Sequence, residues 1–195
     1  TVHFPIWHQE IEDILVLKNN KGTEDNRVRK LDYSIQISKL FYERFIQDGE
    51  ITLFSPHDVP GLYDSFGSDS FDDLYVSYEK DPSIKKKTVK AQELILNLLK
   101  ERAETGRIYI MNIDHCNSHS SFKDKVNMSN LCQEITLPTD PIQHIDDTHG
   151  EIALCILSAI NVGKVKSDEE LEELCDLSVR GLDELIDYQK YPVAA

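Results

Sequence analysis

Glycine is scarce in this sequence, and its scarcity excludes several common phosphate-binding motifs. Only eight glycines occur among 195 residues, and none belongs to a G-x-G-x-x-G fingerprint, a P-loop or a G-x-S-x-G nucleophile turn. Loops that cradle phosphate groups with backbone amides usually need such clusters. Any contact with a nucleotide must therefore be made in another way, or by residues outside this sequence.

Long apolar stretches and an excess of positive charge are also missing. No apolar run approaches the ~18 residues that cross a bilayer. The 21 basic and 35 acidic residues give a net charge of −14, and such a surface repels nucleic acids and anionic membranes. We therefore expect no membrane, DNA or RNA as a partner. Residues 140–195 carry 13 acidic and only four basic side chains, which we interpret as a solvated helix face.

Cysteine is too sparse for a disulfide scaffold. The four cysteines lie at positions 116, 132, 155 and 175, and none forms a C-x-x-C pair. The start of the sequence shows no basic segment followed by an apolar one, so no signal peptide is predicted. Reduced thiols and a cytoplasmic location are the expectation. The length and the 40% of hydrophobic residues suit one soluble domain with a sizeable core.

The hydrophobic patterns alternate between the periods of helices and strands, which predicts an α/β fold with a parallel or mixed sheet, or part of a barrel. A β-prone segment spans residues 1–5. A polar loop is predicted over residues 114–127, and a solvated turn is predicted at the lysine triplet 85–87. Near-continuous apolar character over 151–162 predicts a strand covered on both faces. The predicted helices span 5–17, 32–46, 69–80, 89–102 and 167–185, and the other predicted strands span 51–54, 107–113 and 131–137, the last being a strand or an extended loop.

One short segment combines three chemically useful side chains. If the segment around Cys132 is extended, Asn130, Cys132 and Glu134 share one face, because side chains two residues apart point the same way. They would offer a hydrogen-bonding amide, a sulfur centre and a general base. The alternative is a buried cysteine beside a polar pair that satisfies itself.

The other cysteines carry weaker signals. Cys155 lies in the middle of the apolar run and, taken alone, resembles a small core residue. Cys175 falls in the apolar stripe of the last predicted helix, so we expect it in the core.

Cys116 lies between His115 and His119, which is a spacing that can hold zinc. Structural zinc needs four ligands, and only a tertiary approach of His144 or His149 could supply the rest. We favour polar loop residues that form turns and hydrogen bonds, and we predict no metal site.

Many short stretches, spread in order over the whole chain, resemble the central part of the large, catalytic subunit of aerobic (class I) ribonucleotide reductases. They are Phe4-Pro-Ile-Trp-His8, Val16-Leu-Lys-Asn-Asn20, Asn26-Arg-Val-Arg29, Asp32-Tyr33, Ile51-Thr-Leu-Phe-Ser-Pro56, Val59-Pro-Gly-Leu-Tyr63, Thr105-Gly-Arg-Ile-Tyr109, Asp114-His-Cys-Asn117, Ser129-Asn-Leu-Cys132, Gly150-Glu-Ile-Ala-Leu-Cys155 and Leu185-Ile-Asp-Tyr-Gln189.

The resemblance implies a fold and a set of roles. The family has a ten-stranded α/β barrel with a central finger loop, and residues 1–195 would be a single segment of it. The fingertip pattern Asn-x-Cys-x-Glu matches Asn130, Cys132 and Glu134. By resemblance, Cys132 becomes a thiyl radical that takes the 3′ hydrogen of the ribose, Glu134 is the base for the 3′ hydroxyl, and Asn130 holds the ribose. Cys155 matches one of two cysteines that are oxidised to a disulfide, and its partner would precede Thr1.

The resemblance also implies partners. A small radical-generating subunit, the remaining segments of a dimeric large subunit, a thioredoxin or glutaredoxin, ribonucleoside diphosphate substrates and nucleotide effectors would all act with this segment. The segment itself is expected to carry no cofactor, and its setting would be the cytoplasm of a bacterium or a phage-infected host. The alternatives are an assembly fragment of a divided enzyme that acts only with its missing pieces, and a zinc-stabilised module.

Overall fold

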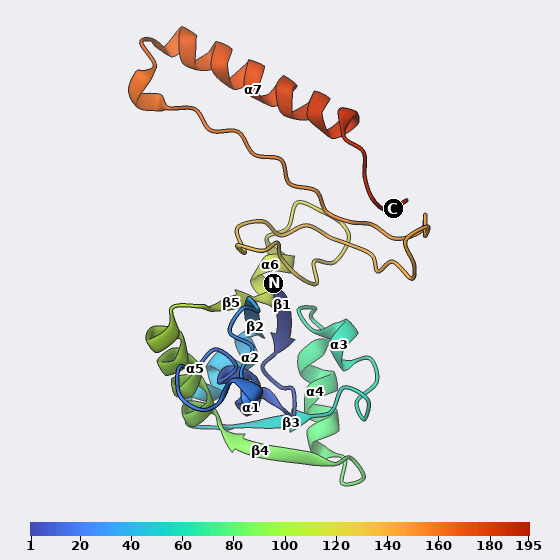
Figure 1. Cartoon of the computed structure of the whole chain (residues 1–195). Helices are drawn as coiled ribbons and strands as arrows, with labels where there is room; N and C mark the ends of the chain where they lie inside the picture. Colours follow the sequence, from blue (N-terminus) through green and yellow to red (C-terminus); the bar gives the residue numbers. More distant parts are fainter. The chain divides into compact units, whose positions relative to one another are not determined.

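The chain forms two compact units, Thr1–Pro138 and Thr139–Ala195. A computed structural model describes all 195 residues apart from the side chain of Asn26 (Figure 1).

The first unit is built on three parallel strands in the order β1-β2-β5. Strand β1 spans Val2–Pro5, β2 spans Tyr33–Ile37 and β5 spans Ile108–Asn112. In their register, Phe4 lies beside Ile35, which in turn lies beside Ile110. All five residues of β2 are buried, as is usual for a central strand of a parallel sheet with both faces covered.

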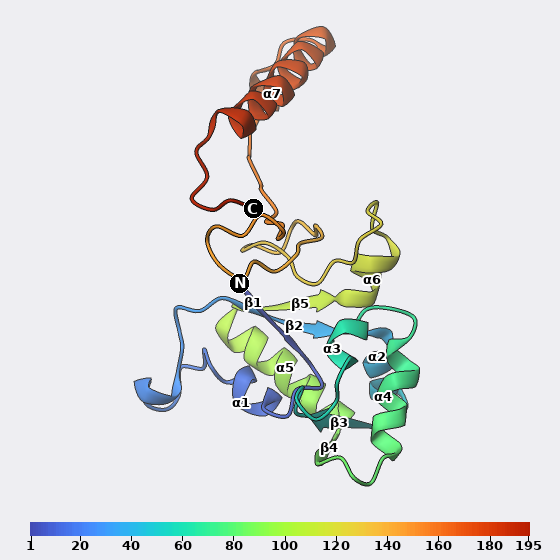
Figure 2. The same cartoon turned by 90° about the vertical axis from the view of Figure 1, so that its right-hand side faces the viewer.

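Helices cover one face of this sheet (Figure 2), and residues 127–133, which follow β5 within the first unit, are hydrogen-bonded to its three strands. Helix α5, Ala91–Thr105, contacts α1, Ile11–Leu15, and α2, Lys39–Ile46. Its apolar residues repeat at helical spacing, and Gly106 ends it in a left-handed conformation with φ of 67°. A short 3-10 helix, η1, spans Glu24–Asn26.

A smaller antiparallel pair completes the core of the first unit. Strand β3, Glu50–Phe54, pairs with β4, Lys86–Lys90, and helices α3, Leu62–Ser65, and α4, Phe71–Lys80, lie between them in the chain. The buried aromatic side chains pack mostly edge to face, which is a favourable geometry for their ring quadrupoles. They include Trp7, Phe41, Phe54, Phe66, Phe71 and Tyr75.

Several local predictions for the first unit were wrong because tertiary pairing overrides local pattern. Pro5 ends β1, so only Ile11–Leu15 of the predicted helix 5–17 is helical, and β2 occupies the first part of the predicted helix 32–46, whose last part is α2. Lys86 and Lys87 of the lysine triplet begin strand β4, whose partner β3 lies more than 30 residues earlier. A short helix, α6, Ile113–Ser118, occupies part of the predicted polar loop. The predictions for β3, α4, α5 and β5 were confirmed within a few residues.

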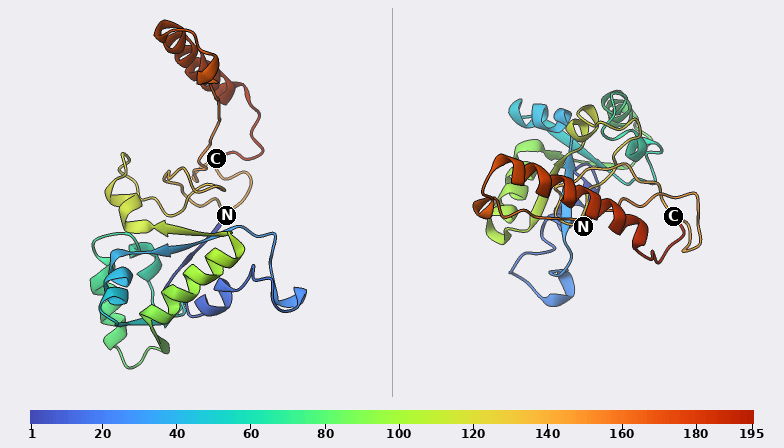
Figure 3. Two further views of the ribbon diagram at one scale, coloured as in Figure 1. Left: turned by 90° about the vertical axis from the view of Figure 1, so that its left-hand side faces the viewer. Right: turned by 90° about the horizontal axis from the view of Figure 1, so that it is seen from above.

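The second unit contains one long helix, α7, Asp168–Tyr188, and a short 3-10 helix, η2, Val162–Lys164 (Figure 3). The predicted helix over 167–185 is confirmed, and it begins with a capping box in which the Ser167 hydroxyl accepts a hydrogen bond from the Glu170 amide at 3.2 Å. The Glu170 carboxylate accepts in return from the amide of Lys166, one residue earlier than in the usual motif. No helix among the described residues is long and apolar enough to cross a membrane.

The predicted buried strand over 151–162 was wrong. Only Glu151 forms a β-bridge, with Asp140, and the rest of the run is irregular and mostly exposed. Leu157 is 77% exposed and Leu154 is 47% exposed. The apolar run finds no strand to pair with among the described residues, so it cannot bury its faces. The α/β class is confirmed, while the three-stranded sheet remains open.

Candidate active site

The segment that carries Asn130, Cys132 and Glu134 is a closed loop and not an extended strand. The amide of Ile135 donates to the side-chain Oδ1 of Asn130 at 3.1 Å, and the amide of Gln133 donates to the Asn130 carbonyl at 3.2 Å. The Ser129 hydroxyl donates to the carbonyl of Ile135. These bonds join the two ends of a seven-residue turn, so the prediction of a common face by strand alternation was wrong.

The loop nevertheless presents the predicted thiol and carboxylate to solvent. Cys132 and Glu134 are exposed, and Gln133 between them is partly buried. Gln133 has a φ of 62°, a left-handed conformation that non-glycine residues seldom adopt. The chain therefore turns at Gln133, and this turn, rather than a strand pleat, leaves both reactive groups accessible. The alternative of a buried cysteine in a satisfied polar pair was wrong.

Hydrogen bonds connect this loop and the residues just before it to all three parallel strands. Gln36 of β2 donates from Nε2 to the Asn127 carbonyl at 2.6 Å, and Gln133 donates from Nε2 to the Ile110 carbonyl of β5 at 2.7 Å. The Nε2 atom of His3, in β1, lies 3.2 Å from both the amide nitrogen and the carbonyl oxygen of Ser129. Burial lowers the pKa of His3 from its ordinary value.

The two cysteines of the second unit are both exposed. Cys155 lies in the irregular run, where its thiol is accessible. Cys175 lies on α7, none of whose residues is buried, so the expectation of a core cysteine was wrong. The helix stripe that contains Cys175 has too few neighbours in its own unit to cover it.

Comparison with known proteins decides the family. A family model described as "Ribonucleotide reductase, barrel domain" matches residues 1–195. The chain belongs to the ribonucleotide reductase barrel domain family. It is 61% identical over its full length to the ribonucleoside-diphosphate reductase subunit alpha of Haemophilus influenzae. Over 99% of its length it is 57% identical to the same subunit of Buchnera aphidicola from Schizaphis graminum and 46% identical to that of Enterobacteria phage T4. The chain spans 26% of the length of each of these curated relatives.

Of the predicted histidine and cysteine cluster, His115 and Cys116 lie on α6, and His119 follows its last residue. The rings of His115 and His119 meet edge to face, with centroids 5.7 Å apart, and the His119 Nδ1 atom lies 3.1 Å from the His115 carbonyl. Burial and the nearby Asp114 raise the pKa of the Cys116 thiol. No group of three or more metal-ligating side chains converges among the described residues. The zinc-stabilised alternative therefore gains no support.

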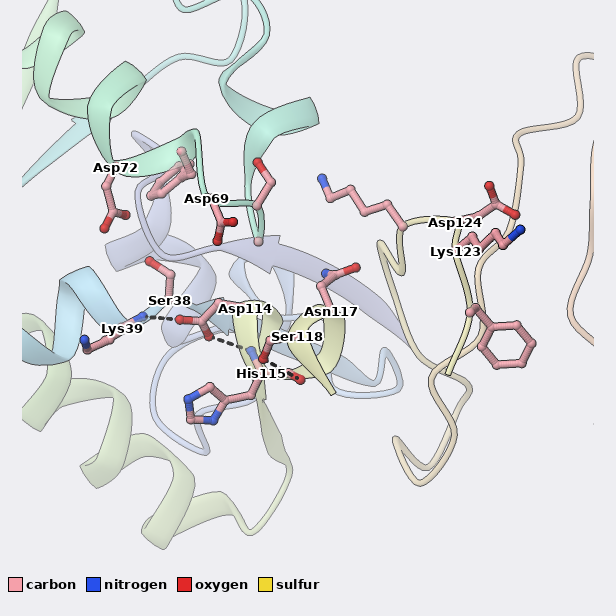
Figure 4. A pocket seen from close by; sticks show the side chains of 15 residues that line it. Ser38, Lys39, Asp69, Asp72, Asp114, His115, Asn117, Ser118, Lys123 and Asp124 are labelled. Carbon is pink, nitrogen blue, oxygen red and sulfur yellow. Dashed lines mark hydrogen bonds between the residues drawn. The ribbon is translucent and has the colours of Figure 1, made fainter. Parts of the chain in front are cut away.

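Sequence patterns did not reveal a cavity of about 680 Å³ at the carboxyl ends of β2 and β5 (Figure 4). Asp114 lies at its wall and accepts from the amides of Lys39 at 2.7 Å and His115 at 2.9 Å. This carboxylate thereby pairs with one backbone amide in the first turn of each of α2 and α6. Burial and the nearby carboxylates raise the pKa of Asp72 in the same wall. The only sequence signal for this arrangement is an aspartate at the start of the Asp114-His-Cys-Asn117 stretch.

Proposed function

We propose that this chain is a central segment of the catalytic subunit of a ribonucleoside-diphosphate reductase, an enzyme that converts ribonucleoside diphosphates to their 2′-deoxy forms. The observation that carries the proposal is the exposed Asn-x-Cys-x-Glu loop within a chain that matches the family along all of its residues. The relatives named above are alpha subunits of such reductases.

The side chains of the loop suit a radical reduction. The thiyl radical of Cys132 takes the hydrogen atom from C3′ of the ribose, which leaves a Cys132 thiol and a substrate radical. Glu134 accepts the proton of the 3′ hydroxyl and later returns it. Asn130 holds the ribose through its side-chain amide, and its Nδ2 donor is compatible with that role because the loop closes on Oδ1 instead.

The reduction needs two further thiols. The 2′ hydroxyl leaves as water, while Cys155 and a cysteine outside this chain give up two electrons and two protons and become a disulfide. Cys132 then returns its hydrogen atom to C3′ and regains the radical. The exposed thiol of Cys155 is accessible for this exchange.

The rest of the assembly follows from the same proposal. The sheet β1-β2-β5 would be part of the ten-stranded barrel, the loop around Cys132 its finger, and residues 1–195 one segment of the catalytic domain. A small subunit would supply the radical, a thioredoxin or glutaredoxin would reduce the disulfide, and nucleotide effectors would bind elsewhere in a dimeric large subunit. The open edge of β5 and the exposed run 151–162 fit a segment whose neighbouring strands lie in other parts of the subunit.

A chimera tests the proposal. Residues 1–195 replace the matching segment of the Haemophilus influenzae alpha subunit, and the chimera is assayed with the small subunit, a dithiol and a ribonucleoside diphosphate. We expect deoxyribonucleotide formation, its loss in Cys132→Ser, and near-native turnover in the control Cys116→Ser. An inactive chimera that is folded and binds the small subunit would contradict a catalytic role and favour an assembly fragment.

A further inference from the structure

Gln133 occupies the variable position of the Asn-x-Cys-x-Glu pattern, so the family pattern gives it no role. Its side chain nevertheless makes the one described hydrogen bond between the tip of the loop and a strand of the sheet, from Nε2 to the carbonyl of Ile110 at 2.7 Å. Its backbone has a φ of 62°, in the left-handed region. A side chain between two exposed neighbours is thus anchored to the sheet.

The anchor has a geometric consequence for the neighbouring residues. Because Gln133 points toward β5, Cys132 and Glu134 on either side of it are left exposed. His3 and Gln36 hold the start of the loop, through Ser129 and Asn127, but neither reaches its tip. The tip is held at two points: the Thr1 hydroxyl, just before β1, donates to the Leu131 carbonyl, and Gln133 donates to the Ile110 carbonyl of β5. Of these two residues, only Gln133 lies between the thiol and the carboxylate and bonds a strand of the sheet.

We propose that Gln133 is a positioning residue, whose hydrogen bond to the Ile110 carbonyl fixes the Cys132 thiol and the Glu134 carboxylate relative to the substrate. This inference rests on the proposed function for its catalytic consequence, while its structural part concerns the loop alone. Positioning matters because a misplacement of about 1 Å at a reacting atom can slow a reaction by about a hundredfold. The Oε1 atom of Gln133 is buried and accepts no described hydrogen bond, so the donor Nε2 carries the anchor.

Three substitutions separate the anchor from the turn. Gln133→Leu keeps the approximate size but removes the donor, and Gln133→Glu replaces the donor with an oxygen that faces the Ile110 carbonyl. Gln133→Gly relieves the left-handed backbone but also removes the anchor. The matched control is Gln92→Leu, since Gln92 on α5 also donates from Nε2 to a backbone carbonyl, that of Phe45.

The experiment uses the complete chimeric subunit with its small subunit and reads two quantities. Hydrogen exchange of the peptide that covers Ser129–Ile135 reports the loop, and kcat and KM report catalysis. In all three Gln133 variants we expect exchange at least about tenfold faster, with kcat lower by about tenfold to a hundredfold and KM for the nucleoside diphosphate changed less than about twofold. Gln92→Leu should match the native chimera in both.

The outcomes are distinguishable. Native exchange and native kcat in Gln133→Leu would overturn the proposal, and so would a rise in KM without a fall in kcat. Full recovery in Gln133→Gly would show that the turn matters and the anchor does not, which would also overturn it. If the native chimera is inactive, the proposed function fails, and the exchange data alone still decide whether Gln133 holds the loop.

Discussion

The side-chain oxygen of Asn130 accepts a hydrogen bond from the backbone amide of Ile135 at 3.1 Å, and this bond closes the loop that carries Cys132. The same side chain is expected to hold the ribose of the substrate. One amide group would therefore serve two purposes, with its oxygen turned to the loop and its nitrogen available to a ligand.

Two substitutions of Asn130 should separate these purposes. Asn130→Asp keeps an oxygen acceptor for the Ile135 amide but loses the Nδ2 donor, whereas Asn130→Ala loses both. In the chimeric reductase we expect Asn130→Asp to keep native hydrogen exchange over Ser129–Ile135 while kcat/KM falls at least about tenfold. Asn130→Ala should show both faster hydrogen exchange over Ser129–Ile135 and a lower kcat/KM. Equal exchange rates in the two variants would show that the oxygen does not close the loop.

The four cysteines should respond differently to replacement by serine. Cys132→Ser should abolish turnover without unfolding the subunit, because an alcohol does not readily form the radical that a thiol forms. Cys155→Ser should stop turnover with a dithiol reductant but allow the first hydrogen abstraction, so abortive breakdown of the substrate is expected.

The remaining two cysteines act as controls. Cys175 is exposed, so Cys175→Ser should change the free energy of unfolding by less than about 0.5 kcal/mol. Cys116→Ser should leave turnover near native. Chromatography of the products measures turnover in the variants of Cys132, Cys155 and Cys116, and urea unfolding measures the stability of Cys175→Ser. Near-normal turnover in Cys132→Ser would overturn the assignment of the radical cysteine.

A partly buried ion pair should contribute measurably to the stability of the first unit. Arg44 donates two hydrogen bonds, both at 2.5 Å, to the carboxylate of Glu79, and its guanidinium lies 5.0 Å from the ring centre of Tyr75. Glu79 also accepts from the Thr52 hydroxyl at 2.7 Å. Glu79→Gln should therefore lower the free energy of unfolding by about 2 kcal/mol.

Urea unfolding followed by the fluorescence of Trp7, the only tryptophan, measures this effect in the first unit. The exposed pair Lys39–Glu43 supplies a control, since Glu43→Gln should cost less than about 0.5 kcal/mol. Equal effects of the two substitutions would mean that burial adds nothing to the Arg44 pair.

The stability of the first unit should fall in mild acid through His3. Burial lowers the pKa of His3 below the ordinary histidine value of 6.5, so the unfolded chain binds a proton more readily than the folded one. The contribution is complete above pH 6.5 and is lost as the pH falls through the lowered pKa of the folded state. His3→Gln should weaken the loss of stability between pH 8 and pH 5, while His57→Gln at an exposed site should not. An unchanged pH response in His3→Gln would exclude this role.

Local patterns were sufficient where the decisive contacts are local. Helix α5 follows from apolar residues at helical spacing and a glycine stop, and α7 follows from the Ser167 capping box. Strand β4 could not be predicted in this way, because a lysine-rich segment becomes a strand only through its pairing with β3.

In the candidate site, too, the residue types were predictable from the local sequence, whereas the shape depends on distant contacts. The residue types at positions 130, 132 and 134 could be chosen from the sequence, and the resemblance supplied their expected roles. The shape of the loop could not, because it depends on His3 and Gln36, which lie about 90 to 130 residues earlier in the chain. The left-handed turn at Gln133 could not be predicted either, because no glycine occupies that position.

The exposed apolar run of the second unit should make the isolated chain associate. Ile152, Leu154 and Leu157 are 44%, 47% and 77% exposed within six residues, and clustered exposed apolar side chains favour self-association. Light scattering under reducing conditions, which exclude a disulfide through Cys155, should show a mass that rises with concentration.

The double variant Leu154→Asp with Leu157→Asp should remove most of this rise, because two charges break the apolar surface. Leu96→Asp is the control, since Leu96 on α5 is 55% exposed but lies outside the run, and it should leave the association unchanged. A native chain that stays monomeric at all concentrations would mean that the run needs no covering partner, which would weaken the case that neighbouring strands of a barrel normally pair with it.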